Sequence, residues 1–342
     1  MTSAASLITA LKTPFTKLGE IDFIAFERLL FRQIASGISG FVVAGTTGDG
    51  CFLTGEEQLE LLRITRACAG EKAMVLGATS SLETKEMIKR TTNGFEAGMS
   101  ASLLLPPYYI RPGMQAIIDY FVAALDIGPG IIYNVPHRTG VDVGVEEISQ
   151  LSRHKNFLGV KECTGLERSQ EHHQRGIRVW SGNDVTAEKE VRSGAAFGVI
   201  SVISNLAPKT ANKLFFEEKK VPPSPLESHS LSRPEKCTNI SACTESLVPQ
   251  KKDELLLHRK RVLQMNECLQ TLITHFNEVP NPVGISTAMA MVELTEPVLW
   301  RPYKIVDARA QEKMLPLLNA LATEELDFKT PRVVDEERWT LV

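Results

Sequence analysis

The sequence predicts an α/β protein: a TIM (β/α)8 barrel followed by a small C-terminal α-helical domain. Short β-rich runs recur eight times in the first two thirds of the 342 residues. Most of them are continuously apolar, which is typical of parallel strands that are covered on both faces. Segments with helical spacing separate the runs. A doubly wound open sheet is the alternative, but no GxGxxG motif follows the first run.

The strand-like runs are spaced as βα units. Their first residues lie 19 to 34 residues apart, which is enough for a strand, a loop and a helix in each unit. The runs cover residues 6–12, 40–47, 73–80, 101–107, 130–136, 157–162, 178–183 and 197–202. Eight such units in succession predict that the sheet closes into a barrel.

The intervening segments carry the signals of helices. Over 23–37 the apolar residues share one face, and Gly37 suits the helix C-terminus. Over 54–70, Thr54 can cap the helix and Glu57, three residues on, completes a capping box. Further helices are expected over 82–99, 111–128 and 211–220, the last of which closes the barrel.

The pattern breaks after the eighth unit, and three regions are expected: a catalytic barrel over 1–217, an insertion over 218–253 and a helical domain over 254–342. The insertion holds five prolines and six serines without periodicity. Such a composition predicts disorder. In the helical domain, helices are expected over 254–276, 282–294 and 307–323, with an irregular end.

Composition excludes several classes of protein. The net charge of −3 argues against nucleic acid as a partner. No run approaches the ~18 apolar residues that a membrane span requires. The six cysteines are dispersed without a CxxC pair, which indicates a reducing compartment. No secretory signal or complete transit peptide is visible, so we expect a soluble protein of the cytoplasm or plastid stroma.

Lys161 is the first candidate for chemistry, because catalytic groups in barrels lie at the C-terminal ends of strands. It closes an apolar run, and burial would lower the pKa of its amine. A neutral amine can attack a ketone and form a Schiff base. The alternative is a lysine paired with Glu162 or another carboxylate at the rim. Neighbours in a strand face opposite ways, so we expect Glu162 to face the helices.

Other strand ends supply further candidates. Tyr133 could shuttle protons or be a core aromatic. Arg138 could bind a carboxylate through two hydrogen bonds or form a rim ion pair. The glycines around Thr46 and Thr47 indicate a tight turn whose N–H groups could hold a carboxylate, or simply the end of a strand. Together these residues predict a carboxylate-binding pocket around Lys161.

Ordered motifs across most of the chain resemble the dihydrodipicolinate synthase family, nearest its plant form. They are GTTGD (45–49), PYY (107–109), YNVPHRTG (133–140), GVKEC (159–163), SGND (181–184), GVISV (198–202) and, after the barrel, VPNPVGISTAM (279–289). The resemblance implies a lyase of lysine biosynthesis through diaminopimelate. It would condense pyruvate with L-aspartate 4-semialdehyde to give 4-hydroxy-tetrahydrodipicolinate, without a metal or an organic cofactor.

The resemblance also assigns residues. Lys161 would form the imine with pyruvate, and Thr46, Tyr133 and Tyr109 would relay protons. Tyr109 would reach into the neighbouring subunit's site, in a homotetramer built as a dimer of dimers. The substrate-binding positions would be Thr47 for the pyruvate carboxylate, Arg138 for the semialdehyde carboxylate, and Gly182 and Ile200 for backbone contacts.

The feedback site of lysine-inhibited relatives is degenerate in this sequence. Gly55 and Gln58 fall where the family carries histidine or tryptophan and then histidine, and Leu82 falls where it carries asparagine. Glu86 and Tyr108 remain. The sequence therefore predicts weak or absent inhibition by lysine.

Two other functions remain open from the sequence. One is another pyruvate-dependent aldolase, such as an N-acetylneuraminate lyase or a sugar-acid aldolase; the arginine of YNVPHRTG favours the synthase instead. The other is a catalytically silent regulatory paralogue. The presence of Lys161 and Tyr133 argues against it.

Overall fold

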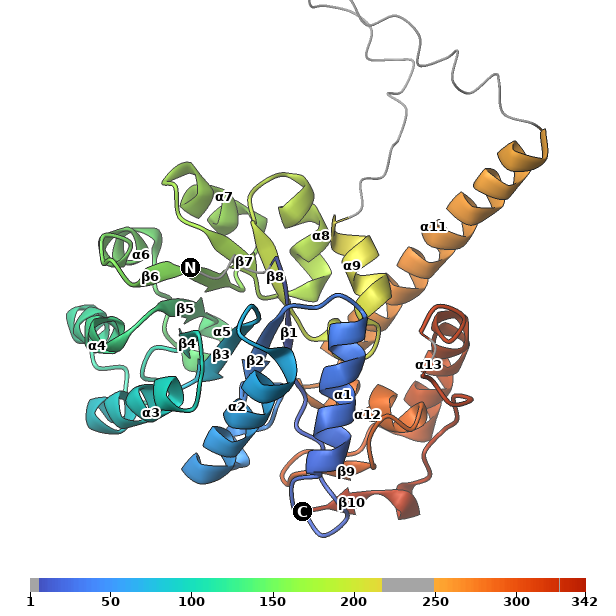
Figure 1. Ribbon diagram of the computed structural model, residues 1–342, viewed down its shortest axis with the longest axis horizontal. Coiled ribbons are helices and arrows are strands. Elements are labelled where there is room, and N and C mark those ends of the chain that lie inside the picture. The colour runs from blue at the N-terminus through green and yellow to red at the C-terminus, as the bar shows by residue number, and fades with distance from the viewer. Residues whose placement is uncertain (1–5, 217–248, 326) are drawn as a thin grey trace, which may run out of the picture.

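The computed structural model describes residues 6–216, 249–325 and 327–342. Eight parallel strands pair in sequential order and close on themselves, which confirms the predicted (β/α)8 barrel (Figure 1). The strands are β1 (Leu7–Ala10), β2 (Gly40–Val43), β3 (Met74–Ala78), β4 (Ala101–Leu104), β5 (Gly130–Asn134), β6 (Phe157–Glu162), β7 (Val179–Ser181) and β8 (Gly198–Ser201). Each lies within the run that predicted it.

Helices surround the barrel as an outer layer (Figure 1). They are α1 (Phe23–Ala35), α2 (Gly55–Ala69), α3 (Thr84–Glu96), α4 (Met114–Ile127), α6 (Val145–Leu151), α7 (Leu166–Gln174), α8 (Asp184–Arg192) and α9 (Pro208–Phe216). The short helix α5 (Pro136–Thr139) directly follows β5 and lies inside this layer (Figure 1). The capping box predicted for α2 is present: Thr54 Oγ1 accepts from Glu57 N at 3.2 Å, and Glu57 Oε2 accepts from Thr54 N at 2.7 Å.

The pairing of β5 with β6 sets the faces of the residues that matter for function. Tyr133 lies beside Lys161, and Asn134 lies beside Glu162. Because side chains alternate along a strand, each pair occupies one face of the barrel wall. Tyr133 belongs to the apolar cluster of the barrel interior, so the Tyr133–Lys161 pair faces inward and the Asn134–Glu162 pair faces the helices. The predicted orientation of Glu162 is confirmed.

The C-terminal region packs on the barrel near α1 and α9 (Figure 1). It contains α11 (Pro249–Asn277), α12 (Val283–Met291), β9 (Val298–Leu299), α13 (Ala308–Leu321) and β10 (Thr340–Leu341). One hydrophobic cluster joins barrel helices to this region, with Leu30 of α1, Leu214 of α9 and Leu318 of α13 all fully buried in it. The C-terminal helices therefore share a core with the barrel.

In the C-terminal region, one boundary and one element differ from the sequence prediction. The helix α11 begins at Pro249, whereas a helix was expected only from residue 254. The rest of the expected insertion, residues 218–248, lies outside the described residues. The chain end, expected to be irregular, contains β10, which pairs in parallel with β9. In the described part of the chain, no helix has both the length and the apolar character needed to cross a membrane.

Candidate active site

A cavity of about 150 Å³ lies at the C-terminal ends of the strands, where active sites of barrels lie. It brings together most of the predicted site residues. Those in its lining are Thr46, Thr47, Tyr133, Arg138, Lys161 and Gly182. The C-terminal region also contributes to the lining, through Ile273, Phe276, Asn277, Asn281, Gly284 and Ile285.

Lys161 is buried at the end of β6, with its Nζ 4.1 Å from the centroid of the Tyr133 ring. Burial lowers the pKa of Lys161, against opposing contributions from Cys163 and Asp184. The structure thus places Lys161 in the buried position expected from the sequence, and its reaction as a neutral amine stays a prediction.

Gly182 makes room for this lysine. A Cβ at position 182 would lie 2.8 Å from Lys161 Cε and 2.4 Å from Cys163 Sγ, closer than side chains pack. The glycine at the end of β7 therefore leaves the volume that the Lys161 side chain occupies.

Tyr133 presents a protonated hydroxyl to the cavity. Burial raises the pKa of Tyr133 well above its ordinary value, and its hydroxyl hydrogen-bonds with Cys163 and Thr46. Sequence reasoning did not single out Cys163 as a site residue. Strand alternation could have identified Cys163, because it lies two residues after Lys161 and so faces the same side. Burial raises the pKa of the Cys163 thiol to about 11.

The turn after β2 holds Thr46 and Thr47 in place. Gly48 N and Gly50 N both donate to Gly45 O at 3.1 Å. A buried ion pair joins Lys12, which follows β1, to Asp49 of this turn. This pair was not expected from the sequence, since its partners lie on different strand ends.

Asn281 connects the turn to Arg138 and was also missed by sequence reasoning. Its Nδ2 donates to Thr47 Oγ1 at 3.0 Å, and its backbone oxygen accepts from Arg138 Nη2 at 3.3 Å. The exposed Arg138 is thereby held at the mouth of the cavity.

Asp184, which begins α8, lies at the same end of the barrel. Its Oδ2 accepts from Val202 N and Ile203 N, both at 2.8 Å. Burial raises the pKa of this carboxyl, and the two backbone donors oppose the change. Asp184 is therefore a buried acidic group at the cavity wall, fixed by the end of β8.

Two predicted site residues lie outside the cavity. Ile200 is buried in the barrel interior, and Val202, two residues further along, lines the cavity in its place. Tyr109 has a backbone φ of 63° and is 86% exposed in this single chain.

The predicted lysine-site positions are divided. Gly55, Gln58 and Glu86 line a second cavity of about 70 Å³ between α2 and α3. Leu82 and Tyr108 are partly exposed and do not line it. Gln58 Nε2 donates to Gly50 O at 2.9 Å.

Among the described residues, no group of three or more histidine, cysteine or acidic side chains is arranged to hold a metal ion.

Known proteins resemble the chain in both sequence and structure. The model of the Dihydrodipicolinate synthetase family matches residues 3–221. The chain is 34% identical to 4-hydroxy-tetrahydrodipicolinate synthase 2, chloroplastic, of Triticum aestivum, over 98% of this chain and 78% of that protein. It is 32% identical to 4-hydroxy-tetrahydrodipicolinate synthase 1, chloroplastic, of Arabidopsis thaliana, over 98% of this chain and 81% of that protein.

A solved structure gives the same result. The 4-hydroxy-tetrahydrodipicolinate synthase of Methylacidiphilum fumariolicum SolV matches with a TM-score of 0.75 and 29% identity. The match covers 95% of this chain and 97% of that one. The shared region therefore includes the C-terminal helices as well as the barrel.

Proposed function

The chain belongs to the dihydrodipicolinate synthetase family, and on this premise we propose that it condenses pyruvate with L-aspartate 4-semialdehyde, with Lys161 as the Schiff-base lysine. The product is 4-hydroxy-tetrahydrodipicolinate. The observation that carries the proposal is the buried amine of Lys161, 4.1 Å from the centroid of the Tyr133 ring in a cavity at the strand ends.

In the proposed reaction, the neutral amine of Lys161 attacks the ketone carbon of pyruvate, and water leaves to form the imine. Loss of a methyl proton gives the enamine. Its carbon attacks the aldehyde of the semialdehyde, a carbon–carbon bond forms, and the aldehyde oxygen takes up a proton. The amino group of the second substrate then attacks the imine carbon, which closes the ring and releases Lys161.

Tyr133 and Thr46 are assigned to proton transfer. The raised pKa of Tyr133 keeps its hydroxyl protonated at neutral pH, and its hydrogen bond to Thr46 gives the proton a path away from the imine. Tyr109, whose ring is exposed, is assigned to the same relay from a second copy of the chain. This assignment makes an oligomer part of the proposal.

The donors of the turn at Thr47 and the guanidinium of Arg138 are each assigned to bind one substrate carboxylate. Thr47 and the backbone of its turn, which line the same cavity as Lys161, receive the carboxylate of pyruvate. Arg138, exposed at the cavity mouth and bonded to Asn281 O, receives the carboxylate of the semialdehyde. The two carboxylates are thereby separated along the depth of the cavity.

The test is reduction of the imine. The protein is incubated with pyruvate and borohydride, and the adduct is located by mass spectrometry. We expect one adduct, on Lys161, and none in Lys161→Ala. Lys12 is the internal control, because it is equally buried but paired with Asp49. Absence of an adduct on Lys161 would reject this function and every pyruvate-aldolase alternative.

A second assay separates the substrates. Aspartate semialdehyde and N-acetylmannosamine are compared as acceptors for the pyruvate-loaded enzyme. We expect turnover with the semialdehyde only. Turnover with N-acetylmannosamine alone would assign the chain to the lyase alternative instead.

A further inference from the structure

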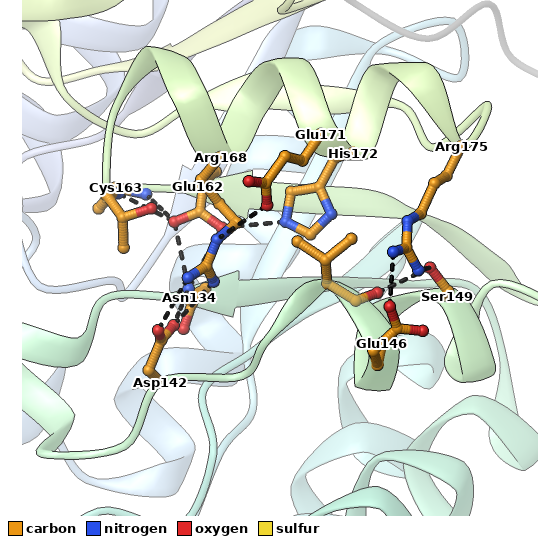
Figure 2. Close-up of polar contacts among 12 residues, drawn as sticks. Asn134, Asp142, Glu146, Ser149, Glu162, Cys163, Arg168, Glu171, His172 and Arg175 are labelled. Atoms are coloured by element: carbon orange, nitrogen blue, oxygen red, sulfur yellow. Dashed lines mark hydrogen bonds and ion pairs between the residues drawn. The ribbon is translucent and has the colours of Figure 1, made fainter.

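A buried polar cluster lies directly behind the reacting residues, between the barrel wall and the helices. It consists of Asn134, Glu162 and His172, which are all less than 2% exposed. Figure 2 shows Glu162 at its centre, with Asn134 on one side and His172 of α7 on the other. The proposed reaction uses none of these residues.

Glu162 collects donors from three directions. Its Oε1 accepts from the backbone N–H groups of Cys163 at 2.8 Å and Thr164 at 2.9 Å. Asn134 Nδ2 lies 3.2 Å from each carboxylate oxygen. His172 Nε2 lies 3.2 Å from Oε2. The carboxylate therefore holds the end of its own strand, the end of β5 and helix α7 together.

Asn134 continues the network toward the surface. Its Nδ2 also donates to Asp142 Oδ1 at 2.8 Å, and its Oδ1 accepts from Val143 N at 3.0 Å. Asp142 in turn makes a two-bond ion pair with Arg168, at 3.0 and 3.1 Å (Figure 2). The cluster thus fixes the loop that follows β5 as well as the strand itself.

The strand period connects this cluster to the cavity. Residues 161 and 163 face the cavity, while 162 between them faces the cluster. Lys161 carries the amine, and the thiol of Cys163 hydrogen-bonds with the Tyr133 hydroxyl. A shift of Glu162 would therefore move the lysine on one side and the partner of the tyrosine on the other.

We propose that Glu162 is a positioning residue for imine formation: through Asn134 and the N–H groups of residues 163 and 164, it holds Lys161 and Tyr133 facing each other. This inference rests on the proposed function. Glu162 touches no substrate, and its effect passes through the geometry of the two strand ends. Displacement of a reacting group by about 1 Å can lower a rate by about a hundredfold.

Glu190 offers a matched control. It is another buried carboxylate behind the wall, on α8, and it accepts from Ser169 Oγ at 2.8 Å and Thr186 Oγ1 at 2.5 Å. None of these contacts reaches the end of β5 or β6. Glu162→Ala and Glu190→Ala remove the same number of atoms from the same layer.

The experiment compares the rates at which borohydride traps the imine that each variant forms with pyruvate. We expect Glu162→Ala to lower the trapping rate and kcat by about ten- to a hundredfold, with a smaller change in KM for pyruvate, because Thr47 lies on another strand end. We expect Glu190→Ala to remain within about threefold of the wild type at a similar loss of Tm. Equal rate losses in the two variants would overturn the proposal, because they would show that removal of any buried carboxylate from this layer has the same effect.

The conservative variant gives a second readout. In Glu162→Gln, the amide oxygen at the position of Oε1 can still accept from both backbone N–H groups and from Asn134 Nδ2, which lies 3.2 Å away. The amide nitrogen can donate to His172 Nε2 if the ring proton moves to Nδ1, an atom without a partner among the described residues. We expect trapping within about threefold of wild type. A loss as large as in Glu162→Ala would contradict the positioning role.

Two further measurements cover a variant that does not fold and a wild type that forms no pyruvate adduct. If Glu162→Ala does not fold, Glu162→Asp withdraws the carboxylate by one methylene, with Glu190→Asp as its control, and a selective loss of trapping is again expected. Competitive labelling with acetic anhydride measures the reactivity of Lys161 without pyruvate. If wild type forms no pyruvate adduct, the proposed function fails. A selective change of Lys161 labelling in the Glu162 variants would still support the positioning role of Glu162. Unchanged labelling of Lys161 in those variants would overturn that role.

Discussion

Lys161 and Glu162 end β6, and with Cys163, which follows the strand, they face two sides of the barrel wall. The first and third side chains line the cavity, and the second is buried among polar groups of the helix layer. Strand alternation alone predicts this division. The partners of Glu162 could not be predicted, because Asn134 and His172 come from a different strand and a helix whose register only the folded barrel sets.

The environment of Lys161 predicts the pH dependence of imine formation. Burial lowers its pKa, so the amine loses its proton at a lower pH than an exposed lysine, whose pKa is about 10.4. Imine formation needs the neutral amine, so the trapping rate should rise with pH and level off below that value. The measurement is the borohydride trapping rate at pyruvate well below saturation, from neutral to alkaline pH, because this rate reports the free enzyme.

The control for this profile is the acetylation of exposed lysines in the same samples. Their reactivity should still be rising with pH where trapping by Lys161 has levelled off. A trapping profile that follows the exposed lysines would contradict a lowered pKa at Lys161.

At the scale of elements, the sequence pattern predicted the features that depend on local sequence. All eight strands lie inside their predicted runs, and the capping box of α2 forms as expected. Two-residue strands such as β9 and β10 have no room for a period and were missed. Asn281 was missed for a different reason: its role depends on packing of the C-terminal segment against the turn after β2.

The cavity between α2 and α3 predicts weak regulation by lysine. At its rim Gly55 offers no side chain, Gln58 is engaged with Gly50 O, and Glu86 is paired with Arg90 at 2.9 Å. This pairing is the main cause of the lowered pKa of Glu86. A lysine ligand would have to displace Arg90 to reach the carboxylate, and none of the described residues that line the cavity carries an imidazole or an indole.

We therefore expect an inhibition midpoint for lysine in the millimolar range, measured on initial rates with both substrates saturating. Arginine at the same concentration controls for nonspecific effects of a cationic amino acid. A micromolar midpoint for lysine would contradict this prediction.

At the scale of the whole molecule, the C-terminal helices are part of both the core and the site. The hydrophobic cluster runs from α1 through α9 into α11 and α13, and Asn281 touches both Thr47 and Arg138. A barrel without this region would lack one wall of its cavity. The sequence predicted the helices but not this role, because apolar spacing does not identify the surface that a helix covers.

Glu325 provides the test of this coupling. It is 2% exposed, and its Oε2 lies 3.2 Å from Arg32 Nη2 of α1. Its Oε1 accepts from the N and Oγ1 of Thr210 in α9, at 3.0 and 3.1 Å. One carboxylate thus joins the C-terminal region to two barrel helices, and its removal leaves a buried guanidinium with one fewer anionic partner.

We expect Glu325→Ala to lower the free energy of unfolding by about 3 kcal/mol, the lower end of the range found when one partner of a buried ion pair is removed. Lys329→Ala, which breaks an exposed pair with Glu293, should cost less than about 1 kcal/mol. Urea unfolding followed by tryptophan fluorescence measures both, because Trp180 reports on the barrel interior while Trp300 and Trp339 report on the C-terminal region. A shared core predicts one transition that shifts as a whole. Two separated transitions would show instead that the C-terminal helices unfold independently of the barrel.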